Sequence, residues 1–323
     1  MSKNTPAVEA VDLSRVYGER VALDHVSLSV ARGEIFALLG PNGGGKTTLF
    51  RILSTLLPPT SGSFSIEGLP GTSSRDVRRR LGVVFQSPSL DRKLTVRENL
   101  LVQGTLYGLH GEDLRRRADQ GLRNFSILDR ADDRVETLSG GLARRAEIAK
   151  ALLHEPPVLL LDEPSTGLDP GARRDLTGLL AGLARSGTAV LLTTHLFEEA
   201  EAAHRLGILD RGRLIAEGTP AELKRSVGGD VVAVETAGDG DAARLLGDIR
   251  DRFGAAAGKT SVVGPTVRLE LPKAHELIPP LVEAFPGRLR SVTLGAPTLE
   301  DVFVERTGRP FREDEGSSEE ARP

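Results

Sequence analysis

The residues best suited to chemistry lie in one glycine-rich loop. It reads Gly40-Pro41-Asn42-Gly43-Gly44-Gly45-Lys46-Thr47-Thr48 and fits the pattern G-x-x-x-x-G-K-[ST]. Glycines at this spacing let backbone N–H groups surround a phosphate, and the start of a following helix adds a favourable dipole. Lys46 would reach the β- and γ-phosphate oxygens, and the Thr47 hydroxyl would ligate Mg²⁺. A plain turn is the alternative, but it has little reason to bear the entropic cost of four glycines in six residues.

A second candidate group is a pair of acids at the end of an apolar run. Residues 158–161 suit a buried strand, and Asp162 and Glu163 follow it directly. At the carboxyl end of a parallel strand, such groups lie beside a phosphate loop. Because successive side chains point to opposite faces, Asp162 is expected to hold Mg²⁺ through its water shell and Glu163 to orient or deprotonate an attacking water. Taken alone, the pair fits ordinary surface acids equally well.

These groups need a scaffold, which the apolar pattern predicts as alternating strands and helices. Strands are expected at 8–13, 21–30, 35–39, 62–68, 81–86, 158–161, 189–193, 206–210 and 213–217. Helices are expected at 47–57, 96–128 with a break at 108–111, 142–153 and 171–184. This alternation predicts an α/β fold with a mostly parallel sheet covered on its faces.

The pattern changes after Gly228-Gly229. Strands are expected at 231–235, 267–271 and 289–294, and helices at 241–252, 274–284 and 299–306. Residues 230–308 are therefore predicted to form a small α+β accessory domain. The acidic, polar stretch 309–323 is predicted to be a disordered tail.

Composition limits the class of protein. A chain of 323 residues predicts about two domains, and no apolar run approaches the roughly 18 to 20 residues that cross a bilayer. No charged-then-apolar leader opens the chain, so neither a membrane-spanning nor a secreted protein is expected. The absence of cysteine excludes disulfides, thiolate metal sites and cysteine nucleophiles, and the net charge of −3 argues against a nucleic-acid binder.

Further segments make the chain resemble the ATP-binding-cassette (ABC) family of ATPases. They are, in chain order, Tyr17, Gln86, the signature motif Leu138-Ser139-Gly140-Gly141, the segment 165–169 and His195. With the loop and the acids they give seven family elements in the expected order over residues 8–220. The resemblance implies a P-loop NTPase of the ABC type over residues 1–225, with a RecA-like core and a helical subdomain near 87–155.

The resemblance also implies a role for each element. Tyr17 would stack on adenine through its flat face, Gln86 would contact Mg²⁺ or the attacking water, and His195 would contact the γ-phosphate. The implied catalytic set is Lys46, Gln86, Glu163 and His195, and the implied metal set is Thr47, Gln86 and Asp162. Without the resemblance, a packing tyrosine at position 17 and a polar strand-end residue at position 86 are simpler interpretations.

The family geometry implies a partner copy of the chain. In ABC ATPases the signature motif of one subunit closes over the ATP held by the other, and this chain has one of each. It is therefore expected to form a two-fold pair around two ATP molecules with Mg²⁺, with Ser139, Gly140 and Gly141 as a second anion site. A simple helix N-cap explains Ser139 as well.

Three segments resemble the daunorubicin-resistance type of drug-export ATPases: 85–100, 106–109 and 297–303. They imply a separate integral membrane permease as partner, with the chain on the cytoplasmic face of the cell membrane. Thr298 and Asp301 form a capping-box pattern, and one helical face is shared by Leu299, Val302, Phe303 and Arg306. A packing helix therefore explains the third segment equally well.

An importer ATPase with a regulatory C-terminal domain is the main alternative to this exporter interpretation. A non-transport ABC ATPase would show a long coiled coil or a second cassette.

Three positions depart from the family pattern. Gly44 stands where Ala or Ser is usual, Arg144 where Gln is frequent, and His204 where an acid is common.

Overall fold

The computed structural model describes residues 5–238, 241–271 and 273–311, which divide into two compact units between Ile215 and Ala216. Within these described ranges, no helix has both the length and the apolar character that crossing a bilayer requires.

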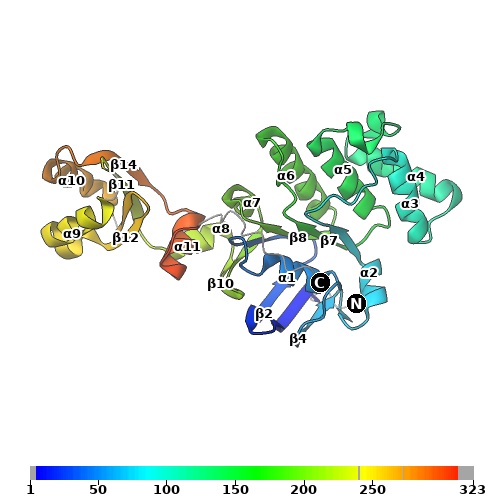
Figure 1. The fold of residues 1–323 in the computed structure, drawn as a ribbon, viewed down its shortest axis with the longest axis horizontal. Coiled ribbons are helices and arrows are strands. Elements are labelled where there is room, and N and C mark those ends of the chain that lie inside the picture. The colour runs from blue at the N-terminus through cyan, green and yellow to red at the C-terminus, as the bar shows by residue number, and fades with distance from the viewer. Residues whose placement is uncertain (1–4, 239–240, 272, 312–323) are drawn as a thin grey trace. The chain divides into compact units, whose positions relative to one another are not determined.

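A six-stranded sheet forms the centre of the first unit (Figure 1). Its order is β10-β9-β3-β8-β7-β6, with β3 Ile35–Leu39, β6 Leu81–Val84, β7 Val158–Asp162, β8 Ala189–Thr194, β9 Arg205–Asp210 and β10 Arg213–Gly218, the last of which runs across the unit boundary. The pairs among β9, β3, β8, β7 and β6 are parallel, as the sequence predicts. Strands β3, β7 and β8 are buried at every residue, which explains why each contains a run of four or five apolar residues.

A second, antiparallel sheet has the order β2-β1-β4-β5. Its strands are β1 Val8–Tyr17, β2 Arg20–Val30, β4 Ser61–Ile66 and β5 Leu69–Pro70. One hydrophobic core joins this sheet to the parallel sheet and to helix α1 (Lys46–Leu53), with Leu13, Phe50 and Leu160 among its buried members. The phosphate loop thus begins and ends on elements fixed by a common core.

Three helices that follow β6 pack against one another: α3 Val96–Leu106, α4 Gly111–Asn124 and α5 Gly140–Ala151 (Figure 1). The predicted break between the first two is confirmed. Helix α6 (Pro170–Arg185) also forms as predicted. The short helices α2 (Ser74–Arg79) and α7 (Phe197–Glu201) were not predicted, because five or six residues show too little periodicity.

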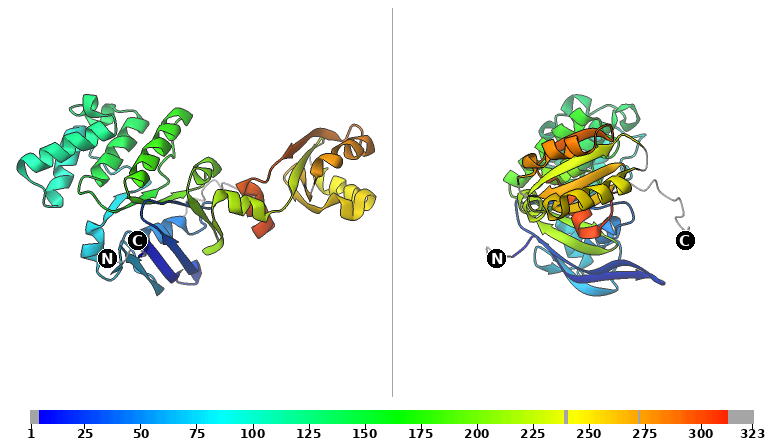
Figure 2. Two further views of the ribbon diagram at one scale, coloured as in Figure 1. Left: turned by 180° about the vertical axis from the view of Figure 1, so that it is seen from behind. Right: turned by 90° about the vertical axis from the view of Figure 1, so that its left-hand side faces the viewer.

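The second unit is built around a βαββαβ sheet. Its elements are α8 Pro220–Ser226, β11 Asp230–Thr236, α9 Ala242–Phe253, β12 Lys259–Val263, β13 Thr266–Leu271, α10 Ile278–Ala284, β14 Leu289–Gly295 and α11 Leu299–Thr307. The order β12-β13-β11-β14 with antiparallel pairs is the ferredoxin-like arrangement. Helices α9 and α10 lie on one face, where Val232, Ile249 and Leu281 share a core (Figure 2). The sequence missed β12, a five-residue strand in a glycine-flanked segment.

Helix α11 contains the C-terminal motif and differs from its prediction in one respect. The Thr298–Asp301 capping box is confirmed, and Leu299, Val302 and Phe303 are fully buried. Arg306, at the C-terminal end of the same helical face, is exposed, so the burial of that face stops before it. The buried arc is instead extended by Asp301, which forms an ion pair with Arg268 of β13.

The first residues of the predicted tail pack on the same helix. The Phe311 ring lies 5.0 Å from that of Phe303, and the Arg309 guanidinium lies 5.7 Å from the Phe303 ring. These contacts hold residues 309–311 against α11, which the prediction of a disordered tail did not expect. Residues 312–323 lie outside the described residues.

Candidate active site

The phosphate loop joins β3 to α1 in a conformation that requires glycine. Gly43 and Gly45 have φ values of 75° and 107°, in the left-handed region that favours glycine. At Gly40 the constraint is contact, because a Cβ atom would lie 2.2 Å from the Leu209 carbonyl oxygen. Gly44 is tight as well: an added Cβ would meet Pro41 O at 3.0 Å and Leu209 O at 3.1 Å.

Lys46 is the first residue of α1, and its side chain is buried inside the loop. Its Nζ donates to Gly40 O at 2.7 Å and to Pro41 O at 3.1 Å, and lies 3.5 Å from Glu163 Oε1. Burial lowers the pKa of Lys46, and the nearby carboxylate of Glu163 opposes that shift. The ammonium group is thus held by backbone carbonyls that charged phosphate oxygens would outcompete.

The acids at the end of β7 are both buried. Asp162 Oδ1 accepts the Thr193 hydroxyl at 2.5 Å, and burial raises the Asp162 pKa while that hydrogen bond lowers it. Glu163 has a backbone φ of 44°, which is uncommon for a residue other than glycine. Its backbone N–H donates to Thr193 O at 3.1 Å and to Thr193 Oγ1 at 3.0 Å. Thr193 therefore orients both acids. Sequence reasoning passed it over, although its place at the end of a buried strand was a usable signal.

The predicted catalytic set meets at the Glu163 carboxylate. Besides Lys46, it is contacted by Gln86, whose Nε2 donates to Oε2 at 3.1 Å, and by His195, whose Nδ1 lies 3.4 Å from Oε2. The Thr166 hydroxyl donates to the same oxygen at 3.3 Å. These side chains come from four separate segments, and the fold brings them together.

One local prediction was wrong. Strand β6 ends at Val84, so Gln86 lies two residues beyond it rather than at its end. Just beyond the strand, the Phe85 carbonyl accepts a hydrogen bond from the Arg144 side chain at 2.9 Å.

The predicted metal set fits Mg²⁺. Asp162 offers a carboxylate and Thr47 a hydroxyl, and Gln86 uses its amide nitrogen on Glu163, which leaves its amide oxygen for a cation. Such a set suits an ion bound chiefly through nucleotide phosphates. Within the described part of the chain, no cluster of three or more His, Cys, Asp or Glu residues could hold a metal by itself.

Tyr17 and the signature motif are not among the groups that contact Glu163 in the described part of the chain. Tyr17 ends β1, is 43% exposed and has the Arg15 guanidinium 4.7 Å from its ring centroid. Ser139 is the N-cap of α5, and its hydroxyl accepts Leu142 N–H at 3.4 Å, so the N-cap interpretation is confirmed. A cavity of about 320 Å³ is bordered by Gln86, Gly140 and Thr166, beside the signature motif.

His204 has a structural task. The imidazole Nδ1 of His204 accepts the Ile35 backbone N–H at 2.9 Å, and the backbone N–H of His204 donates to Ile35 O at 3.0 Å. The histidine thereby anchors the start of β3, the strand that leads into the phosphate loop.

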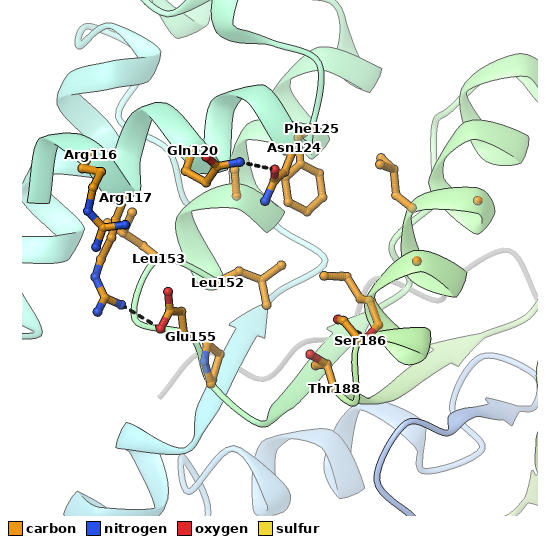
Figure 3. A pocket seen from close by; sticks show the side chains of 17 residues that line it. Arg116, Arg117, Gln120, Asn124, Phe125, Leu152, Leu153, Glu155, Ser186 and Thr188 are labelled. Atoms are coloured by element: carbon orange, nitrogen blue, oxygen red, sulfur yellow. Dashed lines mark hydrogen bonds and ion pairs between the residues drawn. The ribbon is translucent and has the colours of Figure 1, made fainter. Parts of the chain in front are cut away.

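A further cavity, of about 540 Å³, lies between α4, α5 and α6 and contains none of the predicted site residues (Figure 3). Arg117 on its wall pairs with Glu155 at 3.1 Å, and Gln120 donates to Asn124 at 2.7 Å. These polar groups satisfy one another, so we assign the cavity no ligand.

Comparison with known proteins identifies the family. A family model described as ABC transporter matches residues 23–166. The daunorubicin resistance ATP-binding protein DrrA3 of Streptomyces coeruleorubidus is 40% identical over 304 residues, which cover 90% of this chain and 93% of that protein. This chain belongs to the ATP-binding subunits of ABC transporters. The Nod factor export ATP-binding protein I of Sinorhizobium fredii is 38% identical over 325 residues, 97% of this chain and 89% of that one.

Solved structures agree on the cassette fold. An ATP-binding subunit of an ABC transporter matches 69% of this chain and 94% of that chain, with a TM-score of 0.63 and 34% identity. A dimeric ATP-binding cassette in a post-hydrolysis state with ADP and phosphate matches 66% of this chain and 98% of that chain, with a TM-score of 0.60 and 30% identity. The protein is therefore an ABC ATPase with the P-loop NTPase fold.

Proposed function

We propose that ATP hydrolysis by this ABC ATPase drives export through a separate integral membrane permease, from the cytoplasmic face of the cell membrane. The observation that carries the hydrolytic part is the buried Glu163 carboxylate, contacted by Lys46, Gln86 and His195 next to the phosphate loop. Relatives named for daunorubicin resistance and for Nod factor export support the export part.

Each side chain has a task in this proposal. The loop 40–48 wraps the phosphates with its N–H groups, and Lys46 neutralises the β- and γ-phosphate charge. Thr47, Gln86 and Asp162 hold Mg²⁺, which supplies further charge neutralisation when bound. Glu163 orients or deprotonates the attacking water, His195 donates to the γ-phosphate, and Tyr17 stacks on adenine.

The complete site requires a second copy. We place Ser139, Gly140 and Gly141 of one subunit against the ATP held by the other, where the N-terminus of the 12-residue helix α5 offers N–H groups and a favourable dipole. The dimeric cassette among the structural matches supports this arrangement. In this scheme residues 1–225 form the ATPase domain, and residues 230–308 an accessory domain that stabilises or regulates the dimer.

Purification of the tagged chain from gently solubilised native membranes tests the transport claim. Mass spectrometry is expected to find a stoichiometric multi-span membrane protein, absent when the same procedure is applied to untagged cells. Recovery of ribosomes, DNA or no partner would overturn the transport claim and leave the ATPase assignment standing.

A further inference from the structure

The buried side chain of Arg144 connects the signature helix to the candidate catalytic residues. Arg144 lies in the second turn of α5, and its side chain is only 9% exposed. Its Nε donates to Pro164 O at 2.8 Å, one terminal nitrogen donates to Phe85 O at 2.9 Å, and the other donates to Glu163 O at 3.3 Å. All three carbonyls belong to the segments that carry Gln86 and Glu163.

The contact with Glu163 restrains an uncommon backbone conformation. A non-glycine residue with a φ of 44° persists only where its surroundings over-determine it. Thr193 holds the Glu163 N–H from one side, and Arg144 holds its carbonyl from the other. The direction of the Glu163 carboxylate therefore depends on both neighbours.

The same helix turn fixes the segment around Gln86 at both ends. Arg144 holds Phe85 O, and Glu147 Oε1 accepts Ser89 N–H at 2.6 Å. Lys150 adds bonds from Nζ to Ser89 O at 2.7 Å and to Ser89 Oγ at 2.9 Å. Gln86 lies between these anchors, and its side chain donates to Glu163.

Arg144 and Glu147 also neutralise each other, at 2.8 Å, with the Glu147 side chain only 5% exposed. A buried ion pair adds little to stability when hydrophobic residues could replace it. Its retention is explained here by geometry, because the planar guanidinium presents its donors in a fixed fork that spans three separate carbonyls, and the compact ammonium group of a lysine cannot reproduce that span. Arg145, the next residue, instead ties α5 to Asp175 of α6 and makes no contact with either catalytic segment among the described residues.

We propose that Arg144 is a positioning residue for ATP hydrolysis. Together with Glu147 it sets the Gln86 and Glu163 side chains in one geometry and attaches that geometry to the helix that begins at Ser139. A subunit's signature helix thereby acts on its own catalytic glutamate as well as on the ATP of its partner. This inference rests on the proposed ATPase site.

The test compares full-length variants by nucleotide binding, steady-state kinetics and thermal unfolding. The double variant R144M/E147Q removes both charges together, so no buried charge is left unpaired. We expect the Kd for a fluorescent ATP analogue and the KM for ATP to stay within about threefold, while kcat falls roughly 10- to 100-fold, the scale of a misplaced catalytic group. The matched variant R145M should keep kcat within about twofold, because its surface pair contributes little.

A second variant keeps the test decisive if the double variant does not fold. R144K preserves the charge and its pairing with Glu147 but reaches fewer carbonyls, so it should lower kcat at an unchanged KM and melting temperature. A wild-type kcat in R144K or in R144M/E147Q would overturn the proposal. It would also be overturned if kcat fell in R145M too and, in every variant, only in proportion to the fraction of unfolded protein. A wild-type protein that does not hydrolyse ATP would instead overturn the proposed function.

Discussion

The two units each bury an acid, and they use it in different ways. In the C-terminal unit, Asp301 is tied into its own helix cap: its Oδ2 accepts the Thr298 N–H at 2.7 Å and the Thr298 hydroxyl at 2.6 Å, and Arg268 pairs with its other oxygen. In the ATPase unit, the Glu163 carboxylate has longer contacts, of 3.1 to 3.5 Å, with Gln86, Thr166, His195 and Lys46.

This difference in contacts distinguishes an acid that stabilises the fold from a candidate catalytic acid. Asp301 Oδ2 is engaged by the cap of its own helix and Oδ1 by the ion pair with Arg268, so a ligand would have to displace these contacts. Glu163 is instead fixed through its backbone, by Thr193 and Arg144, while its side chain keeps weaker partners. A carboxylate held in this way can change partners when nucleotide and water enter.

Loss of Lys46 should give the largest effect. Lys46→Ala removes the one point charge in the loop, so we expect ATP turnover to fall by on the order of 10²–10³ or more and nucleotide affinity to drop with it. Phosphate release and binding of a fluorescent ATP analogue measure both. Lys93→Ala, at a lysine that is 78% exposed and pairs with Glu136, is the control. Normal hydrolysis in Lys46→Ala would contradict the site assignment.

Glu163→Gln should separate binding from chemistry. The amide keeps the shape of the side chain but cannot take a proton, so ATP should still bind while hydrolysis slows by roughly 10²–10⁴. We expect an ATP-bound dimer on a sizing column. Glu155→Gln, at an exposed ion pair with Arg117, should turn over normally and show no such trapping. A Glu163→Gln variant that stays monomeric with ATP would show that closure does not occur with this chain alone.

Asp301→Ala tests the other half of the comparison. It removes the capping box and leaves Arg268 buried without its partner, which should destabilise the C-terminal unit by about 3 kcal/mol. Thermal unfolding followed by circular dichroism measures this loss, and Glu300→Ala on the same helix turn should cost no more than about 1 kcal/mol. ATP turnover per folded molecule should be unchanged. If turnover falls while the protein is folded, Asp301 has more than a structural role.

Tyr17→Ala should have the smallest effect. Loss of one stacking face weakens nucleotide binding by about 1 kcal/mol, which is roughly a fivefold rise in the KM for ATP, with kcat retained. Tyr17→Phe keeps the ring and should behave like the wild type. An unchanged KM in Tyr17→Ala would indicate that Tyr17 only packs against Arg15.

Much of the fold follows from local pattern. The buried strands β3, β7 and β8 each contain a run of four or five apolar residues, and the break between α3 and α4 falls at glycines. The apolar pattern missed short elements and the burial of a charged side chain. Strand β12 has five residues, and α11, which packs against α8, also buries an acid that pairs with Arg268 of β13.

The phosphate loop, the two acids and the other family elements could be predicted from the sequence, because each depends on residue types at fixed local spacing. How these groups are held depends on contacts between distant segments. Parallel pairing of β7 with β8 sets Thr193 opposite Asp162, and the packing of α5 brings Arg144 to carbonyls 19 to 59 residues away. Buried polar groups must find partners, and which segments supply them depends on strand order and helix packing rather than on spacing along the chain.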